Sequence, residues 1–288
     1  MTGSWGNSPP GEAEESRSAR RAGDTVTVMI TPSGVEPRDP RIFPMSISST
    51  VRTVAYTTGG AAPQLLDVYR PQSTPAPSRA VLLWHGMGPD MRSEVAPLAE
   101  ETAAHGLTVF VPDWRSDAPD GGRAHLTASL RYVRENAAGF GADPERLVVA
   151  GWSAGAGAAI GTALRPDLMD GWLPKAVVGI AGLYWRPARS TGSVPLEDLG
   201  GFDGRRVPVT LIHGTADTEV ECRHSRDFLA ALDEREWPAR LHETETDHAG
   251  VIMTSYDAGL GHCVPTTDAD ALRAGRATAR LIAEAASA

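Results

Sequence analysis

One pentapeptide of this sequence has the composition of a reactive serine turn. Residues 151–155 read Gly-Trp-Ser-Ala-Gly, which fits the pattern Gly-x-Ser-x-Gly with Ser153 at its centre. A serine hydroxyl is a weak nucleophile, so its attack on a carbonyl requires a general base and a third group that orients the base. An ordinary glycine-serine loop is the alternative interpretation, and the neighbouring segments decide between the two.

The segments on either side of Ser153 predict a strand, a sharp turn and a helix. Residues 146–150 are mainly apolar and branched, as in a short buried strand. Residues 154–164 are rich in small side chains, which suits a helix packed closely on a sheet. Glycine permits a tight turn, and a helix N-terminus directs N–H groups toward developing negative charge. This context favours a nucleophilic serine.

The general base must be chosen among eight histidines. His248 is predicted to be the base, because it lies in a loop that follows the last predicted strand of the sheet and precedes the C-terminal helical region. His242 falls inside a strand pattern and His262 in a later loop, where a surface or core role is the more common one. The position of the loop therefore selects His248.

The acid that orients this base is predicted to be Asp217. An apolar strand ends near residue 212 and the chain turns at Gly214, so Asp217 emerges at the carboxyl edge of the sheet, where ligands of open α/β sheets bind. A turn or N-cap role is the alternative for this aspartate. Glu219 and Asp247 are weaker candidates for the same role.

A second glycine-containing loop is placed to supply oxyanion donors. Residues 85–88 read His-Gly-Met-Gly and directly follow an apolar strand. The backbone N–H groups of Met87 and Ala154 are predicted to form the oxyanion hole. The sites assigned to substrate contact are Gly86, Gly88, Trp152 and Trp185, with core packing as the alternative for the two tryptophans.

The order of elements predicts an α/β fold with a mostly parallel, doubly wound sheet and helices on both faces. An antiparallel hairpin joined at residues 59–60 begins the sheet. Strands are expected at 50–58, 64–70, 80–84, 107–111, 146–150, 176–180, 207–212 and 239–243, and helices at 93–104, 124–138, 154–164, 225–237 and 268–286. Residues 185–206 are predicted to be a short lid loop with at most a short helix, which leaves the active site open.

Composition narrows the classes of function. The 288 residues are 41% hydrophobic and carry a formal charge of −9, so a nucleic-acid binder is not expected, and acidic substrates receive no long-range electrostatic steering. The two cysteines, Cys222 and Cys263, are too few for a disulfide scaffold, so reduced thiols are expected, although one disulfide between them stays open. Neither a metal nor an organic cofactor is expected.

The N-terminal segment is predicted to differ from the rest of the chain. Residues 1–45 are rich in Pro, Gly, Ser and charge, which predicts a disordered extension before a single domain at 46–288. The segment 24–31 is a candidate stray strand, and Met29 and Met45 are alternative natural starts. The sequence has neither an apolar run long enough for a membrane span nor a signal-peptide core, so a cytoplasmic location is expected.

Taken together, these segments resemble the α/β-hydrolase superfamily, and within it bacterial carboxylesterases of the feruloyl-esterase-like and hormone-sensitive-lipase-like branch. The resemblance covers residues 50–288. Besides the serine turn, it rests on residues 66–71, 111–119, 213–220 and 247–250. Many relatives carry His-Gly-Gly-Gly where this chain has Met87 at the third place, which weakens transfer of the tertiary-alcohol specificity linked to that form.

The resemblance implies a carboxylesterase that cleaves short-chain or aryl esters through an acyl-enzyme. Its expected partner is a small-molecule ester or amide, and the oligomeric state is left open. An amidase such as a formamidase, a peptidase, or an acyltransferase with the same triad are alternatives. A catalytically silent binding protein of the same fold is a further alternative, which the full set of catalytic residue types argues against.

Overall fold

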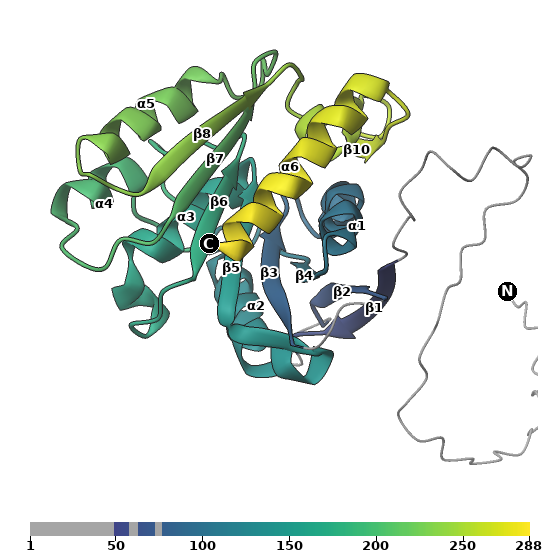
Figure 1. The fold of residues 1–288 in the computed structure, drawn as a ribbon, viewed down its shortest axis with the longest axis horizontal. Helices are drawn as coiled ribbons and strands as arrows, with labels where there is room; N and C mark the ends of the chain where they lie inside the picture. The colour runs from purple at the N-terminus through teal and green to yellow at the C-terminus, as the bar shows by residue number, and fades with distance from the viewer. Residues whose placement is uncertain (1–48, 58–62, 73–76) are drawn as a thin grey trace, which may run out of the picture. The chain divides into compact units, whose positions relative to one another are not determined.

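Eight strands form one sheet in the computed structural model of the protein, which describes residues 49–57, 63–72 and 77–288 (Figure 1). The predicted N-terminal extension 1–45, the stray strand and the turn at 59–60 lie outside the described residues. In chain order the strands are β1 (Ser49–Ala55), β2 (Leu65–Pro71), β3 (Ser78–Trp84), β4 (Leu107–Pro112), β5 (Ala142–Trp152), β6 (Ala176–Ile180), β7 (Val209–Gly214) and β8 (Ala239–Thr244).

The strand order explains how distant segments meet at one edge. Across the sheet it is β1-β2-β4-β3-β5-β6-β7-β8. β1 pairs with β2 and β2 with β4 in antiparallel fashion, whereas every pairing from β4 to β8 is parallel. The loops after β3, β5, β7 and β8 therefore leave the same carboxyl edge.

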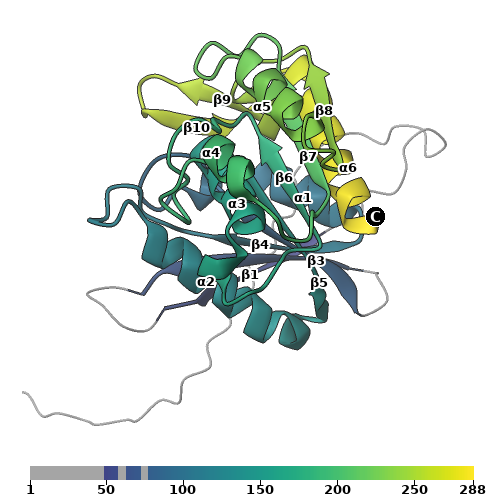
Figure 2. The ribbon, with the colours of Figure 1, turned by 90° about the vertical axis from the view of Figure 1, so that its left-hand side faces the viewer.

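Helices cover both faces of the sheet (Figures 1 and 2). α1 (Ala96–Ala104) and α6 (Ala269–Ser287) pack on one face, and α2 (Arg123–Asn136), α3 (Ala154–Leu164), α4 (Pro195–Gly201) and α5 (Arg223–Asp233) pack on the other. The described residues also form four short 3₁₀ helices: η1 (Arg92–Val95), η2 (Ala137–Phe140), η3 (Pro166–Met169) and η4 (Gly250–Ile252). The predicted mostly parallel sheet with two helical layers is confirmed.

The central strands are mainly apolar in their middle segments because both of their faces are covered. In β3, Leu82 and Trp84 belong to the core beneath α2 and α3, whereas Val81 and Leu83 belong to the core beneath α1 and α6. This alternation follows from the two-residue period of a strand. Such burial on both sides makes the sheet a fixed frame for the loops at its edge.

Besides shifts of a few residues at element ends, three local differences separate the structure from the predicted elements. A hairpin of β9 (Thr254–Asp257) and β10 (His262–Pro265) occupies a segment for which no strand was predicted. The helix expected from residue 93 begins as η1 and becomes α-helical only at Ala96. Pro97 suits the first turn of this helix, because N–H groups there have no acceptor within the helix and proline therefore loses no hydrogen bond. β5 is longer than predicted and continues directly to Trp152.

The two cysteines are both buried and free. Among the described residues, no helix combines the length and apolarity needed to cross a membrane. The segment expected to form a lid contains one short helix, α4. No other helix or strand of the described structure lies between β6 and β7.

Candidate active site

Ser153 occupies a strained turn between β5 and α3. Its backbone has φ 54° and ψ −118°, a conformation that a residue with a side chain rarely adopts. The turn is held on both sides, because the Ser153 N–H donates to the Ile180 carbonyl at 2.8 Å and its carbonyl accepts from Ala156 N–H at 3.0 Å. The turn thus fixes the serine at the carboxyl edge of the sheet.

The glycines of the pentapeptide are required by close approach. A Cβ on Gly151 would overlap the Gly155 carbonyl, and a Cβ on Gly155 would lie 2.5 Å from the carbonyl oxygen of His85. A Cβ on Gly86, in the loop after β3, would lie 3.3 Å from the Cβ of Ser153. These contacts place the loop 85–88 directly against the serine turn.

His248 and Asp217 form the central polar contact of the site. His248 Nδ1 lies 2.7 Å from Asp217 Oδ2, although 31 residues separate the two in sequence. A carboxylate only accepts hydrogen bonds, so Nδ1 carries the proton and Nε2 of the neutral ring keeps its lone pair. The histidine is therefore held in the tautomer that a general base requires.

The backbone selects Asp217 as the partner of His248. Asp217 Oδ1 accepts hydrogen bonds from the N–H groups of Glu219 and Val220 at 3.0 and 2.8 Å, which leaves Oδ2 for the histidine. Glu219 thus contributes its backbone to this arrangement. Asp247 Oδ1 accepts from Ala249 and Gly250 N–H groups and shapes the histidine loop.

A second histidine, His213, also lies against Asp217. Its sequence context predicted no role for it. Its ring is fully buried, with Nε2 donating to the Val220 carbonyl at 2.7 Å and lying 3.3 Å from Asp217 Oδ2. Nδ1 contacts the Ser225 hydroxyl at 2.7 Å. The only signal in the sequence is a His-Gly pair at the end of a strand.

These hydrogen bonds keep Asp217 ionised. Burial raises the pKa of its carboxyl, but hydrogen bonds from His213 and His248 and from backbone N–H groups outweigh burial and hold the pKa well below its usual range. At neutral pH the group beside the His248 ring is therefore a carboxylate, which stabilises a positive charge on that ring.

Trp152 holds the histidine loop. Its indole Nε1 donates to the His248 carbonyl at 2.9 Å, and the two rings lie with their centroids 4.9 Å apart. The indole is buried, and its atoms also close the space next to Gly86. The sequence predicts either substrate contact or core packing for Trp152, and the contacts of its indole in the structure are with the loops that carry His248 and Gly86.

The loop after β3 is fixed by a buried neutral histidine. His85 Nδ1 donates to the Gly86 carbonyl at 2.9 Å, and Nε2 accepts from the N–H groups of Met91 and Trp114 at 3.3 and 3.1 Å. Burial lowers the pKa of His85 to about 3, so Nε2 remains an acceptor at neutral pH. Gly88 N–H donates to the Ser116 hydroxyl at 3.0 Å.

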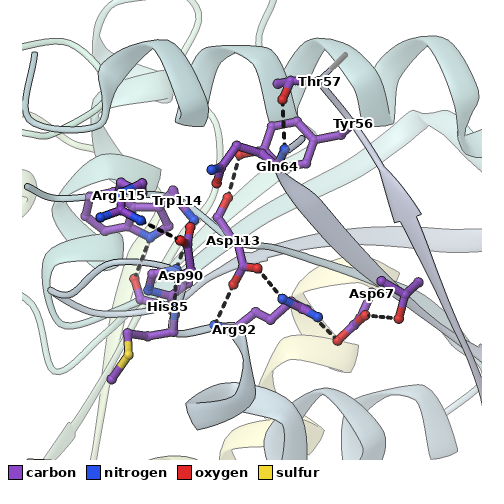
Figure 3. A network of polar contacts seen from close by, with 12 residues as sticks. Tyr56, Thr57, Gln64, Asp67, His85, Asp90, Arg92, Asp113, Trp114 and Arg115 are labelled. Carbon is purple, nitrogen blue, oxygen red and sulfur yellow. Dashed lines mark hydrogen bonds and ion pairs between the residues drawn. The ribbon is translucent and has the colours of Figure 1, made fainter. Parts of the chain in front are cut away.

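An ion-pair network anchors this loop to the sheet (Figure 3). Arg92 contacts Asp67 of β2 at 2.8 Å and also pairs with Asp113, which follows β4. Asp113 precedes Trp114, whose N–H contacts His85, and the Asp113 carbonyl accepts from the Tyr56 hydroxyl. The position of residues 85–88 therefore depends on contacts from three neighbouring strands.

Met87 and Ala154 line one cleft of about 520 Å³. Within the part of the chain that the structure describes, neither backbone N–H donates a hydrogen bond to protein. Ala154 is the first residue of α3, where N–H groups have no partner inside the helix. Two residues that line this cleft beside the serine turn therefore carry backbone N–H groups without a protein acceptor in the described structure.

Trp185 lies in a second cleft of about 350 Å³, together with Tyr184, Leu196 and His224. Its indole Nε1 donates to His224 Nδ1 at 3.2 Å, and the side chain is 43% exposed. His242 lies in β8 and His262 in β10, and neither contacts Asp217 in the described structure. Of the three histidines that the sequence offers as a base, His248 is the one that contacts Asp217.

The family of the chain follows from its sequence match as well as from this architecture. A family model described as the alpha/beta hydrolase family matches residues 81–286. The match includes all the strands from β4 to β8 and the serine, aspartate and histidine segments. The chain therefore belongs to the alpha/beta hydrolase family.

Solved structures with a similar fold include esterases. A truncated carbohydrate esterase from gut microbiota is 17% identical, with 85% of this chain and 99% of that chain covered and a TM-score of 0.61. An esterase of Thermogutta terrifontis with propionate bound is 21% identical, with 84% and 94% covered and a TM-score of 0.63. Its form phosphorylated by paraoxon is 22% identical, with 86% and 95% covered and a TM-score of 0.61. A search of curated protein sequences found no match.

Proposed function

We propose that the protein is a serine hydrolase that cleaves carboxylic esters of short-chain acids or aryl alcohols. The observation that carries this proposal is the 2.7 Å contact between His248 Nδ1 and Asp217 Oδ2, at the sheet edge that also carries the strained Ser153. Strain of this kind collects at functional sites, where the surrounding structure maintains it. The similar fold of an esterase that paraoxon phosphorylates agrees with the proposal.

The first half of the reaction forms an acyl-enzyme. His248 Nε2 takes the proton of the Ser153 hydroxyl while the serine oxygen bonds to the substrate carbonyl carbon. Asp217 holds the ring in place and stabilises its positive charge. When the tetrahedral intermediate collapses, the carbon–oxygen bond to the alcohol breaks, and the imidazolium proton passes to the leaving oxygen.

The second half repeats these steps with water. His248 takes a proton from the water molecule, the hydroxyl bonds to the acyl carbon, and the acid leaves as Ser153 regains its proton. In both halves, the Met87 and Ala154 N–H groups bind the oxyanion. Loss of one such donor costs a factor of about 10² to 10³ in rate in other enzymes.

The size and setting of the cleft support small substrates. About 520 Å³ accommodates an aryl or short acyl group, and α4, with seven residues, is the one α-helix between β6 and β7 in the described structure. We therefore expect turnover to fall as the acyl chain lengthens. A clear preference for long acyl chains would contradict this part of the proposal.

The test is covalent labelling combined with turnover. A fluorophosphonate probe followed by peptide mapping should modify Ser153, and Ser153→Ala should lose both labelling and hydrolysis of p-nitrophenyl acetate. Ser287→Ala, at the exposed end of α6, is the matched control and should retain both. A panel of acetate to octanoate esters and formanilides separates esterase from amidase activity. Undiminished ester turnover in Ser153→Ala would refute the proposal.

A further inference from the structure

Three arginines line the cleft next to Ser153. Arg123 lies at the start of α2, and Arg186 and Arg189 lie in the segment after β6. The same cleft is lined by Met87 and Ala154, the residues proposed to bind the oxyanion. The guanidinium groups therefore border the space in which a substrate of Ser153 would lie.

Two of these arginines reach across the cleft in opposite directions. The Arg123 guanidinium lies against Gly192, where a Cβ would overlap it, and Arg189 Nη1 lies 2.9 Å from the position of a Cβ on Gly121. Both glycines have positive φ, 78° and 69°. Each wall thus supplies an arginine and, for the opposite arginine, a glycine that permits close approach. We call Arg123, Arg186 and Arg189 the arginine cluster.

The arginine cluster has no carboxylate partner in the described structure, whereas several other arginines do. Arg92, Arg115, Arg165 and Arg226 all form ion pairs with carboxylates. No side-chain hydrogen bond or ion pair to the arginine cluster occurs among residues 49–57, 63–72 and 77–288. Arg186 instead lies over the Trp185 ring, with its Cζ 4.2 Å from the centroid.

One carboxylate also lines the cleft, but it is already occupied. Asp120 Oδ1 accepts from the Gly122 N–H at 3.0 Å, and Oδ2 accepts from the Ala124 N–H at 2.7 Å. Burial raises the pKa of this carboxyl, and the backbone hydrogen bonds lower it by more. Asp120 therefore serves the start of α2, and three cations face one carboxylate in a chain whose net charge is −9.

We propose that the arginine cluster binds an anionic group on the substrate, so that the enzyme prefers esters carrying a second carboxylate or a phosphonate or phosphate. This inference rests on the proposed function, since it names the substrate class of that site. A guanidinium presents paired donors that match the oxygens of such groups. The acidic surface gives these substrates no long-range steering, so the preference arises inside the cleft.

The test compares charged esters with neutral esters of matched shape. On the acyl side, mono-p-nitrophenyl glutarate is compared with its methyl ester, and on the alcohol side 4-acetoxybenzoate is compared with methyl 4-acetoxybenzoate. A third pair replaces the glutarate carboxylate by a phosphonate. The wild-type ratio of kcat/KM for charged over neutral ester should exceed 1 in at least one pair, and the responding pair identifies the anion and its side of the ester.

Substitution then links the preference to the arginine cluster. Arg123→Gln and Arg189→Gln should each lower that ratio by on the order of 10- to 100-fold, the effect of one charge-assisted hydrogen bond. Arg205→Gln is the matched control, because Arg205 is exposed in the loop that enters the opposite edge of the sheet, and it should leave the ratio unchanged. A ratio at or below 1 in every pair, or a ratio that neither substitution lowers, overturns the inference.

A measurement of anion binding tests the arginine cluster separately from the proposed hydrolase activity. Turnover of neutral esters by wild type but not by Ser153→Ala supports the hydrolase, whatever the charge preference. Phenylglyoxal modifies arginines, so peptide mapping with and without glutarate or 3-phosphonopropionate reports on the arginine cluster without turnover. Protection of the arginine cluster but not of Arg205 supports the inference even in an inactive protein. Equal modification with and without both anions overturns it.

Discussion

Replacement of Asp217 by asparagine tests the orientation of the proposed base. The side-chain oxygen must stay at the Oδ1 position, because two backbone N–H groups donate to it there, at 3.0 and 2.8 Å. The amide NH₂ then takes the place of Oδ2, which now lies 2.7 Å from His248 Nδ1. A donor in that place forces Nδ1 to accept, so the proton moves to Nε2 and the lone pair that would receive the serine proton is lost.

The expected loss in kcat for Asp217→Asn is about 10⁴-fold, as for the equivalent change of tautomer in a serine protease. This loss corresponds to about 5 kcal/mol of activation free energy. The free energy of unfolding should fall by only about 1–3 kcal/mol, because the two backbone hydrogen bonds survive and the loss is confined to the contacts of Oδ2 with His248 and His213. The variant should therefore remain folded while it is inactive.

The assay is steady-state hydrolysis of p-nitrophenyl acetate, with urea unfolding followed by circular dichroism. Asp247→Asn is the matched control, since it removes the same charge next to His248 and its oxygen can still accept from the Ala249 and Gly250 N–H groups. The control should keep kcat within a few-fold of wild type. A kcat within tenfold of wild type in Asp217→Asn, or an equal loss in Asp247→Asn, would refute the reasoning.

Two further predictions concern stability. Ser153→Gly should abolish turnover yet stabilise the fold by about 1 kcal/mol, because glycine tolerates φ 54°. Thermal unfolding should then show a rise in Tm of about 2–4 °C. A lowered Tm would contradict the inference that the Ser153 backbone is strained. The pKa of His85 is lowered to about 3 by burial, so the unfolded chain takes up its proton first as pH falls below about 6.5. The stability contributed by neutral His85 is complete above that pH and declines toward pH 3, by about 2 kcal/mol between pH 6.5 and 5. Urea unfolding at pH 7 and 5 should show a shallower decline in His85→Gln, and equal slopes would refute the assignment.

The elements that position the site were predictable because their signals are local. The apolar runs of β3 to β7 reflect burial on both faces, and glycine next to Ser153 reflects the close approach of backbone atoms. Because parallel strands share a carboxyl edge, the sequence was enough to predict that Ser153, Asp217 and His248 lie at that edge. The hairpin β9–β10 was missed, because it covers only short segments with a weak alternating pattern.

The contacts between loops were decided by the tertiary structure. Gly214 allows the loop 246–247 to approach β7 closely, and this approach brings the loop of His248 next to the strand that precedes Asp217. The position of Trp152 on the histidine loop and the support of Asp217 by His213 likewise join residues whose separation in sequence carries no pattern. Such contacts depend on side-chain directions in three dimensions.

The sequence by itself therefore determined the order of the strands of the main sheet and of the longer helices, the serine turn and the candidate acid and base, since periodicity and turn chemistry act over a few residues. The tertiary structure alone brought Arg123 and Arg189 to opposite walls of one cleft, each beside a glycine of the other wall. The formal charge of the chain gave no sign of that local excess of positive charge, because net charge sums over the chain whereas binding depends on the few charges that face one cavity.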